Sequence, residues 1–318
     1  MSDCLSPKTK KVLKRRGESV ATFRACVLVL RDQIACVRQL LKAVHNKGGD
    51  EATRVHELRV ACRRAQSWVL FFEAACPVSL LDPISKRLRK IRRATNEVRE
   101  LDVLIENIRN WPIVPNRARL LRILQKHRND AAARMRDELK RSLNSKRLRK
   151  LSMQLSLSQK ENRDCTDEQS PFLQTPFRDF AVTSLRSQLE DYLCQRPTNW
   201  KDIDAIHRFR IQGKHARYNL ELFSVLVPKK TASKALKAFV EIQTELGNLH
   251  DRAQGVSMIQ SQLESADSLT LAAAWQTIFD RERRKLSKMQ KQLPNQLSEA
   301  RFQLLHRQLR KLLAATKR

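Results

Sequence analysis

Two stretches of this 318-residue chain repeat one pattern at a fixed distance, and the repeat constrains the fold more than any other feature. Each stretch has a His, an Arg three residues later, and a second basic residue four further on. The two copies, 151 positions apart, are His56, Arg59, Arg63 and His207, Arg210, Lys214. Such fixed-period similarity predicts an internal duplication, with two similar units related by pseudo-twofold symmetry.

The match extends well beyond the paired stretches. The same offset relates Pro77 to Pro228 and Lys86 to Lys237, and it carries the Arg-Glu pair that begins at Arg99 to a His-Asp pair in the second half. No gap interrupts this span. The two units are therefore expected to place equivalent basic helices on either side of one shared groove.

Hydrophobic residues recur at three- and four-residue spacing through most of the chain, which is typical of helices. Glycine is scarce, with 6 residues, and strand patterns are nearly absent. The expected fold is all-α: two pseudo-symmetric four-helix bundles with a basic groove or pore between them. We expect a basic N-terminal tail over 1–18, a first bundle over 19–151, a polar linker over 152–171 and a second bundle over 172–318.

The charge balance narrows the range of partners. Lys and Arg total 63 against 33 Asp and Glu, a formal net charge of +30, which concentrates polyanions such as nucleic acid, an anionic membrane or an inorganic polymer. The 7 cysteines form no CxxC pair, so neither a zinc knuckle nor a disulfide framework is indicated. Without a signal-type apolar segment or a membrane-length apolar run, we expect a soluble cytoplasmic protein.

The paired stretches predict helices that are apolar on one side and cationic on the other. On a helical wheel His56, Arg59 and Arg63 form one stripe, with Leu58 and Trp68 around the opposite arc. Arg offers a planar fork to phosphate oxygens, Lys a mobile point charge, and His a charge that changes near neutral pH. A solvated charged face is the alternative for a single such helix, but duplication of residue type and phase favours a binding site.

A third basic stripe, Lys86, Arg89, Lys90 and Arg93, follows in the first half. The equivalent segment of the second half keeps one lysine but has Val240 where the first half has an Arg. The groove is therefore expected to be more cationic on the first-half side, unless this stripe is simply solvated.

At HELRVACRR, HRFRIQGKHARYNLE and the later ELDVL and LGNLHD elements, the chain resembles the CHAD family of α-helical domains named for their histidines. The resemblance implies a stand-alone member that binds inorganic polyphosphate between two helical bundles, without catalysis, cofactor or metal. Departures from the family pattern are Gln66, His215 and Glu100. From the motifs and the third stripe together, the expected polyphosphate-binding residues are His56, Arg59, Arg63, Arg64, Lys86, Arg89, Arg93, His207, Arg210, Lys214, Arg217 and Tyr218.

Two alternatives from other classes remain open. His207, His215, the dyad of His250 and Asp251, and Asp280 superficially fit an HD-type metal phosphohydrolase, although the dyad occupies the repeat position of an Arg-Glu pair. Nucleic-acid binding is the other, and weak binding of nucleic acid at low salt is expected of so basic a chain. Only 5% of residues are aromatic, which disfavours base stacking.

The sequence does not say what the binding is for. Granule targeting, phosphate homeostasis and scaffolding are all compatible with one groove, as is association with polyphosphate or storage granules. Binding is expected to weaken with salt, and to strengthen as pH falls if His56 and His207 become charged in the complex. Polymer length preference, protein partners and oligomeric state are left open.

Overall fold

A computed structural model describes residues 5–16, 20–46, 50–144, 153, 155 and 172–315. Every regular element in these ranges is a helix, which confirms the expected all-α fold. The α-helices are α1 (Pro7–Arg16), α2 (Thr22–His45), α3 (Glu51–Phe71), α4 (Val78–Ala94), α5 (Asn96–Asn110), α6 (Arg117–Asn144), α8 (Phe177–Cys194), α9 (Ile203–Phe223), α10 (Lys229–Glu264), α11 (Leu269–Gln296) and α12 (Glu299–Ala314). Two short 3-10 helices, η1 (Glu73–Ala75) and η2 (Ser224–Leu226), follow α3 and α9.

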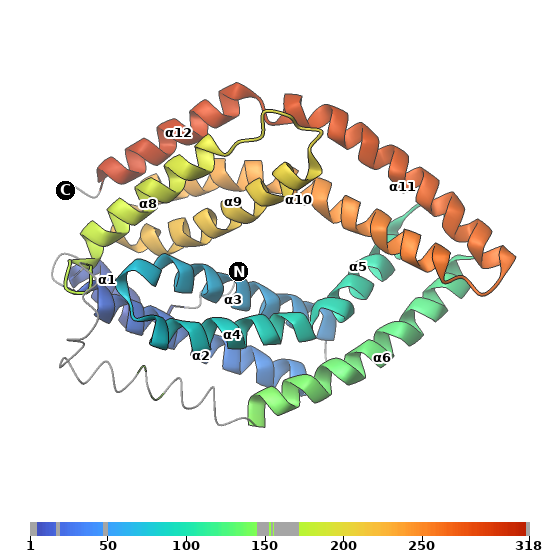
Figure 1. The fold of residues 1–318 in the computed structure, drawn as a ribbon, viewed down its shortest axis with the longest axis horizontal. Coiled ribbons are helices and arrows are strands. Elements are labelled where there is room, and N and C mark those ends of the chain that lie inside the picture. Colours follow the sequence, from blue (N-terminus) through green and yellow to red (C-terminus); the bar gives the residue numbers. More distant parts are fainter. Residues whose placement is uncertain are drawn as a thin grey trace.

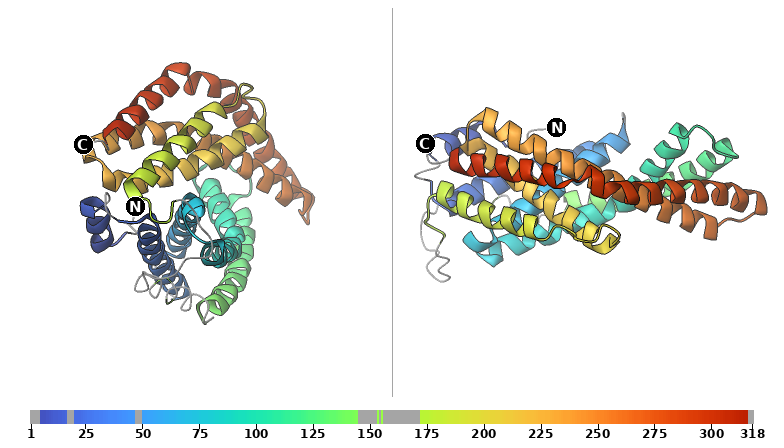
Figure 2. Two further views of the ribbon diagram at one scale, coloured as in Figure 1. Left: turned by 60° about the vertical axis from the view of Figure 1, so that its left-hand side comes forward. Right: turned by 90° about the horizontal axis from the view of Figure 1, so that it is seen from above.

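The helices fall into two groups in chain order. Figures 1 and 2 show α2 to α6 on one side of the molecule and α8 to α12 on the other. The groups meet where α3 packs against α9, the two helices that carry the repeated pattern. One continuous set of buried apolar side chains runs through both groups.

The matched sequence positions have matched structural roles. Asp50 caps α3 by accepting a hydrogen bond from Thr53 N at 3.1 Å, and Asp202 caps α9 by accepting one from Ala205 N at 2.9 Å. After each helix comes a 3-10 turn and a proline, Pro77 or Pro228, before the next helix begins. The ancestral duplication and the domain boundaries themselves stay predictions.

The halves differ after these prolines. In the first half the chain breaks at Thr95 into α4 and α5, whereas the second half has the uninterrupted 36-residue α10. The Thr95 hydroxyl accounts for part of the break, because it donates to Arg92 O at 2.8 Å and satisfies a carbonyl at the end of α4.

Aromatic contacts and a backbone bridge fix the start of the second group against the first. The rings of Phe71 and Phe72 lie 5.4 Å and 6.0 Å from the ring of Phe180 in α8. Thr22 N donates to Thr175 O at 2.9 Å just before α8 begins. Inside the second group, the Tyr192 ring stacks on Phe209 with centroids 4.3 Å apart.

The segment 1–18, expected to be a basic tail, contains α1. Leu13 of this helix is fully buried, and α1 packs against α2 and η2. Lysines dominate the sequence of α1, so its two apolar positions gave too little signal for a packed helix. Apart from residues 153 and 155, the expected linker over 152–171 lies outside the described residues.

Candidate functional site

The contact between α3 and α9 is held by polar bonds as well as apolar packing. Trp68 Nε1 donates to Tyr218 O at 2.9 Å, and Ser67 Oγ lies 2.7 Å from His215 Nδ1. Because these bonds join side chains from the last turns of α3 to the middle of α9, they fix how the two basic stripes lie relative to each other.

Five basic side chains lie around Arg63 on α3 and on the two helices that pack against α3, α4 and α9. We call them the central cluster: Arg59, Arg63, Arg92, Arg210 and Lys214. Arg63 is near enough to the other four to repel each of them electrostatically, and these four come from α3, α4 and α9. The sequence-predicted residues of the two copies are therefore brought together across the contact between the halves.

The positive charge of the central cluster is poorly compensated. Its one ion pair among the described residues joins Arg210 Nη2 to Asp251 Oδ1 at 3.2 Å, and the Asp251 side chain is 66% exposed. Arg92 donates to the neutral amide oxygen Gln66 Oε1 at 3.0 Å. The Nε atoms of Arg63 and Arg210 are buried without a hydrogen-bond partner in the described ranges. Such an arrangement favours an added anion.

Burial and mutual repulsion shift the proton equilibria of the central cluster. Burial, followed by the charges of Arg63 and Arg92, lowers the pKa of Arg59 to about 10. The pKa of Arg92 is lowered by burial and by Arg63. Burial, followed by Arg210 and Arg63, lowers the pKa of Lys214 to about 7. Each shift shows that the charged form is disfavoured without a counterion.

Arg59 and Arg63 do different things although both were expected to face a ligand. Arg59 Nη1 donates to Arg92 O at 2.9 Å, to Thr95 Oγ1 at 3.1 Å and to Asn96 Oδ1 at 2.6 Å. Arg59 therefore holds the junction of α4 and α5, whereas the guanidinium group of Arg63 makes no hydrogen bond to a described residue.

The histidines lie at the edge of the central cluster. His56 is exposed, and burial of its ring atoms followed by Arg99 and Arg63 lowers its pKa. His207 Nδ1 lies 3.4 Å from His250 Nδ1, the ring that replaces Arg99 in the second half. Burial, followed by Arg210 and His207, lowers the pKa of His250 to about 4. His56 and His250 are thus mostly neutral at pH 7.

Three expected ligand residues pack within the contact between α3 and α9 instead. Arg64 is 7% exposed, its Nε lies 3.3 Å from Glu221 Oε2, and its guanidinium group lies 5.6 Å from the centre of the Tyr218 ring. The guanidinium group of Arg217 lies 4.8 Å from the centre of the same ring, and its Nε lies 3.7 Å from Glu221 Oε1. Tyr218 is only 3% exposed, and Arg217 is half-buried and near enough to Lys214 to repel it electrostatically.

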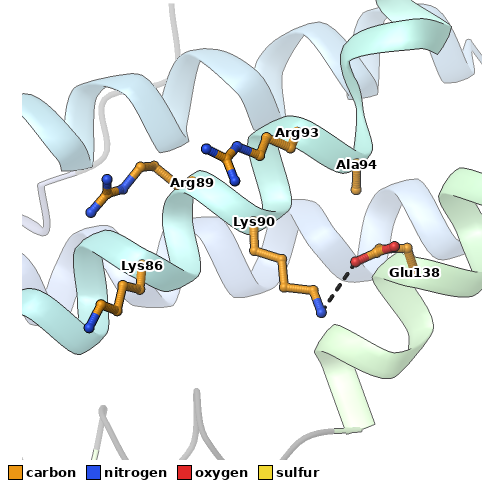
Figure 3. Close-up of a pocket in the computed structure, with 6 residues that line it drawn as sticks. All are labelled: Lys86, Arg89, Lys90, Arg93, Ala94 and Glu138. Atoms are coloured by element: carbon orange, nitrogen blue, oxygen red, sulfur yellow. Dashed lines mark ion pairs between the residues drawn. The ribbon is translucent and has the colours of Figure 1, made fainter.

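The third stripe lines an open pocket between α4 and α6 (Figure 3), and its Arg89 and Arg93 are near enough to Arg92 of the central cluster to repel it. Lys86, Arg89 and Arg93 are exposed there, and Lys90 reaches Glu138 of α6 at 3.3 Å. The expected groove between the two bundles stays a prediction, because this pocket belongs to the first group alone.

Arg92 is the residue that the sequence analysis missed. It lies beside Ile91 at the border of the charged arc of α4, and a border arginine can extend along its apolar neighbours toward the adjoining helix. The position of Arg92 at the border of the charged arc was therefore the one feature of the sequence that could have indicated its place in the central cluster.

Two further observations bear on the class of site. The described residues hold no group of three or more His, Cys, Asp and Glu suited to a metal ion, and Asp251 of the proposed HD dyad accepts a bond from Arg210. Within the described ranges, no helix is both long enough and apolar enough to cross a membrane.

Comparison with solved structures identifies similar folds. A crystal structure of the CHAD domain from the plant Ricinus communis is similar with a TM-score of 0.63 and 23% identity, over 87% of this chain and 93% of that chain. PptA from Streptomyces chartreusis is similar with a TM-score of 0.56 and 13% identity, over 92% of this chain and 99% of that chain. Among curated proteins, no relative matches this chain.

The family model described as CHAD domain matches residues 29–260, which include both repeated patterns and the whole central cluster. Because this match spans most of the chain and the fold is that of a CHAD domain structure, the chain belongs to the CHAD domain family.

Proposed function

We propose that this protein binds inorganic polyphosphate without catalysis and that the central cluster makes the main contacts. The main support is that five basic groups from both halves of the chain lie close together, and that one exposed carboxylate pairs with them. The CHAD family is associated with polyphosphate binding and generally serves binding rather than classical catalysis, which supports the proposal.

The chemistry of the ligand follows from the donors that remain available. Arg63 and Lys214 are half-buried and make no ion pair with a described residue, so phosphate oxygens could accept from both. A polymer that repeats its charge along a line would continue from the central cluster past the exposed His56 and His207, one or two helical turns away.

Nucleic acid is the second candidate because the net charge of +30 attracts any polyanion. Nucleotide-binding surfaces for single strands commonly add exposed aromatic rings on which bases stack. Here Trp68, Phe209 and Tyr218, the aromatics of α3 and α9 nearest the basic stripes, are at most 3% exposed. A polyanion without bases therefore suits this surface better.

A competition titration separates the two candidates. Labelled long-chain polyphosphate is bound to the protein at near-physiological salt, about 0.15 M, and displaced with single-stranded RNA or with unlabelled polyphosphate. We expect RNA to compete at least about tenfold less well per phosphate. Equal competition per phosphate would favour general polyanion binding and overturn the assignment of polyphosphate.

A role for such binding in granule targeting or phosphate homeostasis, and a cytoplasmic or granule-associated location, belong to the same proposal. Co-localisation of the tagged protein with stained polyphosphate in its own cells, lost in a variant of the central cluster, tests that part.

A further inference from the structure

Lys214 occupies an unusual electrostatic position in the central cluster. It lies on α9 one turn after Arg210, its side chain is half-buried, and it makes no ion pair or hydrogen bond with a described residue. The charged and titratable groups that face it come from three helices: Arg63 of α3, Arg210 and Arg217 of α9, and Asp251 and His250 of α10. One carboxylate, Asp251, thus faces Lys214 together with three guanidinium groups, of which Arg217 is paired with Glu221 at 3.7 Å.

Asp251, the single carboxylate that faces Lys214, does not offset the repulsion that Lys214 experiences from the arginines. Asp251 already accepts a bond from Arg210 at 3.2 Å, and its side chain is largely solvated. His250 adds no negative charge. The ammonium group therefore has both a desolvation penalty and like-charge repulsion in the ligand-free protein, and together these bring its pKa to about 7.

An anion placed among Arg63, Arg210 and Lys214 reverses that balance. Negative phosphate oxygens favour the charged ammonium form by direct attraction and offset the repulsion from the two arginines. We propose that the binding of a phosphate polyanion at the central cluster is coupled to uptake of a proton by Lys214. The inference rests on the proposed function and adds a mode of regulation by pH to the same site.

The direction of the coupling follows from linkage. The free Lys214 loses its proton as pH rises through about 7, while the bound Lys214, with a raised pKa, keeps its proton to higher pH. Between these two pKa values, binding takes up close to one proton, and affinity falls as pH rises by up to about tenfold per pH unit. Acidification therefore strengthens binding, and alkalinisation releases the polymer.

The histidines act in a different pH range. The pKa values of His56, His215 and His250 are all lowered in the free protein, and a bound polyanion raises them, so the protons that they gain on binding are gained from below pH 6.5 up to their bound-state pKa values and are lost again at higher pH. Proton uptake that grows from about pH 6 to about pH 8.5 is consequently specific to a group such as Lys214.

Isothermal titration of the full chain with long-chain inorganic polyphosphate tests the proposal. At each pH the titration is run in two phosphate-free buffers with different ionisation enthalpies, and the difference in observed heat gives the number of protons taken up. Long chains keep the contribution of titratable terminal phosphates small. We expect Lys214 to take up little proton at about pH 6 and about one proton per protein molecule at about pH 8.5. The affinity for polyphosphate should be lower by roughly tenfold or more at the higher pH.

Two substitutions, one that keeps the positive charge and one that removes it, keep the test independent of folding effects. Lys214→Arg keeps a permanent charge and Lys214→Met removes it, so both variants should lose the uptake of protons at about pH 8.5 and the fall in affinity above pH 7. Lys288→Arg, at an exposed lysine of α11, should keep the wild-type uptake and pH dependence.

The outcomes separate this inference from the proposed function. Tight binding with no proton uptake, or uptake that both Lys214 variants retain, would overturn the coupling and leave polyphosphate binding standing. Absence of polyphosphate binding at either pH would overturn both.

Discussion

Arg59 and Arg63 lie one helical turn apart on α3 and differ in what surrounds their guanidinium groups. Three oxygen atoms at the junction of α4 and α5 accept bonds from Arg59, whereas Arg63 faces the other cations of the central cluster. Arg59 is therefore mainly a structural residue, and Arg63 is the better candidate to touch a ligand.

This difference predicts opposite effects of two alanine substitutions. Arg59→Ala leaves polar atoms of the junction without their donor, so the free energy of unfolding should fall by roughly 1–3 kcal/mol. Arg63→Ala removes repulsion and no hydrogen bond, so that free energy should change by less than about 0.5 kcal/mol or rise. Urea denaturation of both variants measures the difference. Equal losses of stability would mean that Arg63 also has a structural role.

The sequence predicted that the basic residues of each pattern share one helical stripe, but not what each arginine contacts. The stripe of His56, Arg59 and Arg63 follows from helical periodicity, which is a local property. Whether an arginine bonds to a helix end, pairs with Glu221 as Arg64 does, or stays unpaired depends on neighbours from distant segments. Pattern alone therefore could not separate these three roles.

At the scale of the helices, the backbone of α9 packs very close to side chains of α8 and α10 at Gly213. A Cβ atom added at Gly213 would lie 1.9 Å from Gln243 Nε2 of α10 and 2.9 Å from Tyr192 Cε2 of α8. Gln243 Nε2 also donates to the Tyr192 hydroxyl at 3.3 Å inside the core, so neither side chain can move freely. Glycine at this position lets the basic helix pack closely enough to hold its register against the core.

Gly213→Ala should therefore reduce the free energy of unfolding by roughly 1–3 kcal/mol through overpacking. Gly247→Ala is the matched control on α10, because an added Cβ there meets nothing within 4 Å. The control should gain up to about 1 kcal/mol from helix propensity. Thermal or urea unfolding compares the pair, and a Gly213 variant as stable as its control would contradict the packing described.

Helix content was predictable and helix boundaries less so. Three- and four-residue periodicity indicated helices through both halves, and the prolines at 77 and 228 mark the starts of α4 and α10. The break at Thr95 was not predicted, because hydrophobic periodicity continues through it into Val98 and Leu101. At the break, the Thr95 hydroxyl accepts a hydrogen bond from Arg59, which lies 36 positions earlier in the chain.

At the scale of the molecule, the halves also meet far from the central cluster. Arg281 of α11 donates to Ile113 O, just after α5, and lies 4.8 Å from the centre of the Trp111 ring. Its neighbour Glu282 is buried and pairs with Arg252, Arg281 and Lys285. These contacts connect the two groups in a chain whose like charges otherwise repel.

The net charge of +30 predicts that added salt raises the stability of the ligand-free protein and lowers its affinity for polyphosphate. Sodium chloride should screen self-repulsion and raise the melting temperature of the ligand-free protein by roughly 2–4 °C between about 0.05 M and about 0.3 M. Over the same range the affinity for polyphosphate should fall steeply, because binding releases counterions. A melting temperature that falls with salt would show that ion pairs such as those of Glu282 outweigh the repulsion.

The most direct test of polyphosphate binding at the central cluster compares two variants that each lose two positive charges. Arg63→Ala with Arg92→Ala removes two members of the cluster, and Lys288→Ala with Lys291→Ala removes two exposed lysines of α11. Titration with long-chain polyphosphate at about 0.15 M salt should show about a hundredfold loss of affinity for the first variant and less than about threefold for the second. Equal losses in the two variants would contradict a defined site and leave only diffuse attraction by net charge.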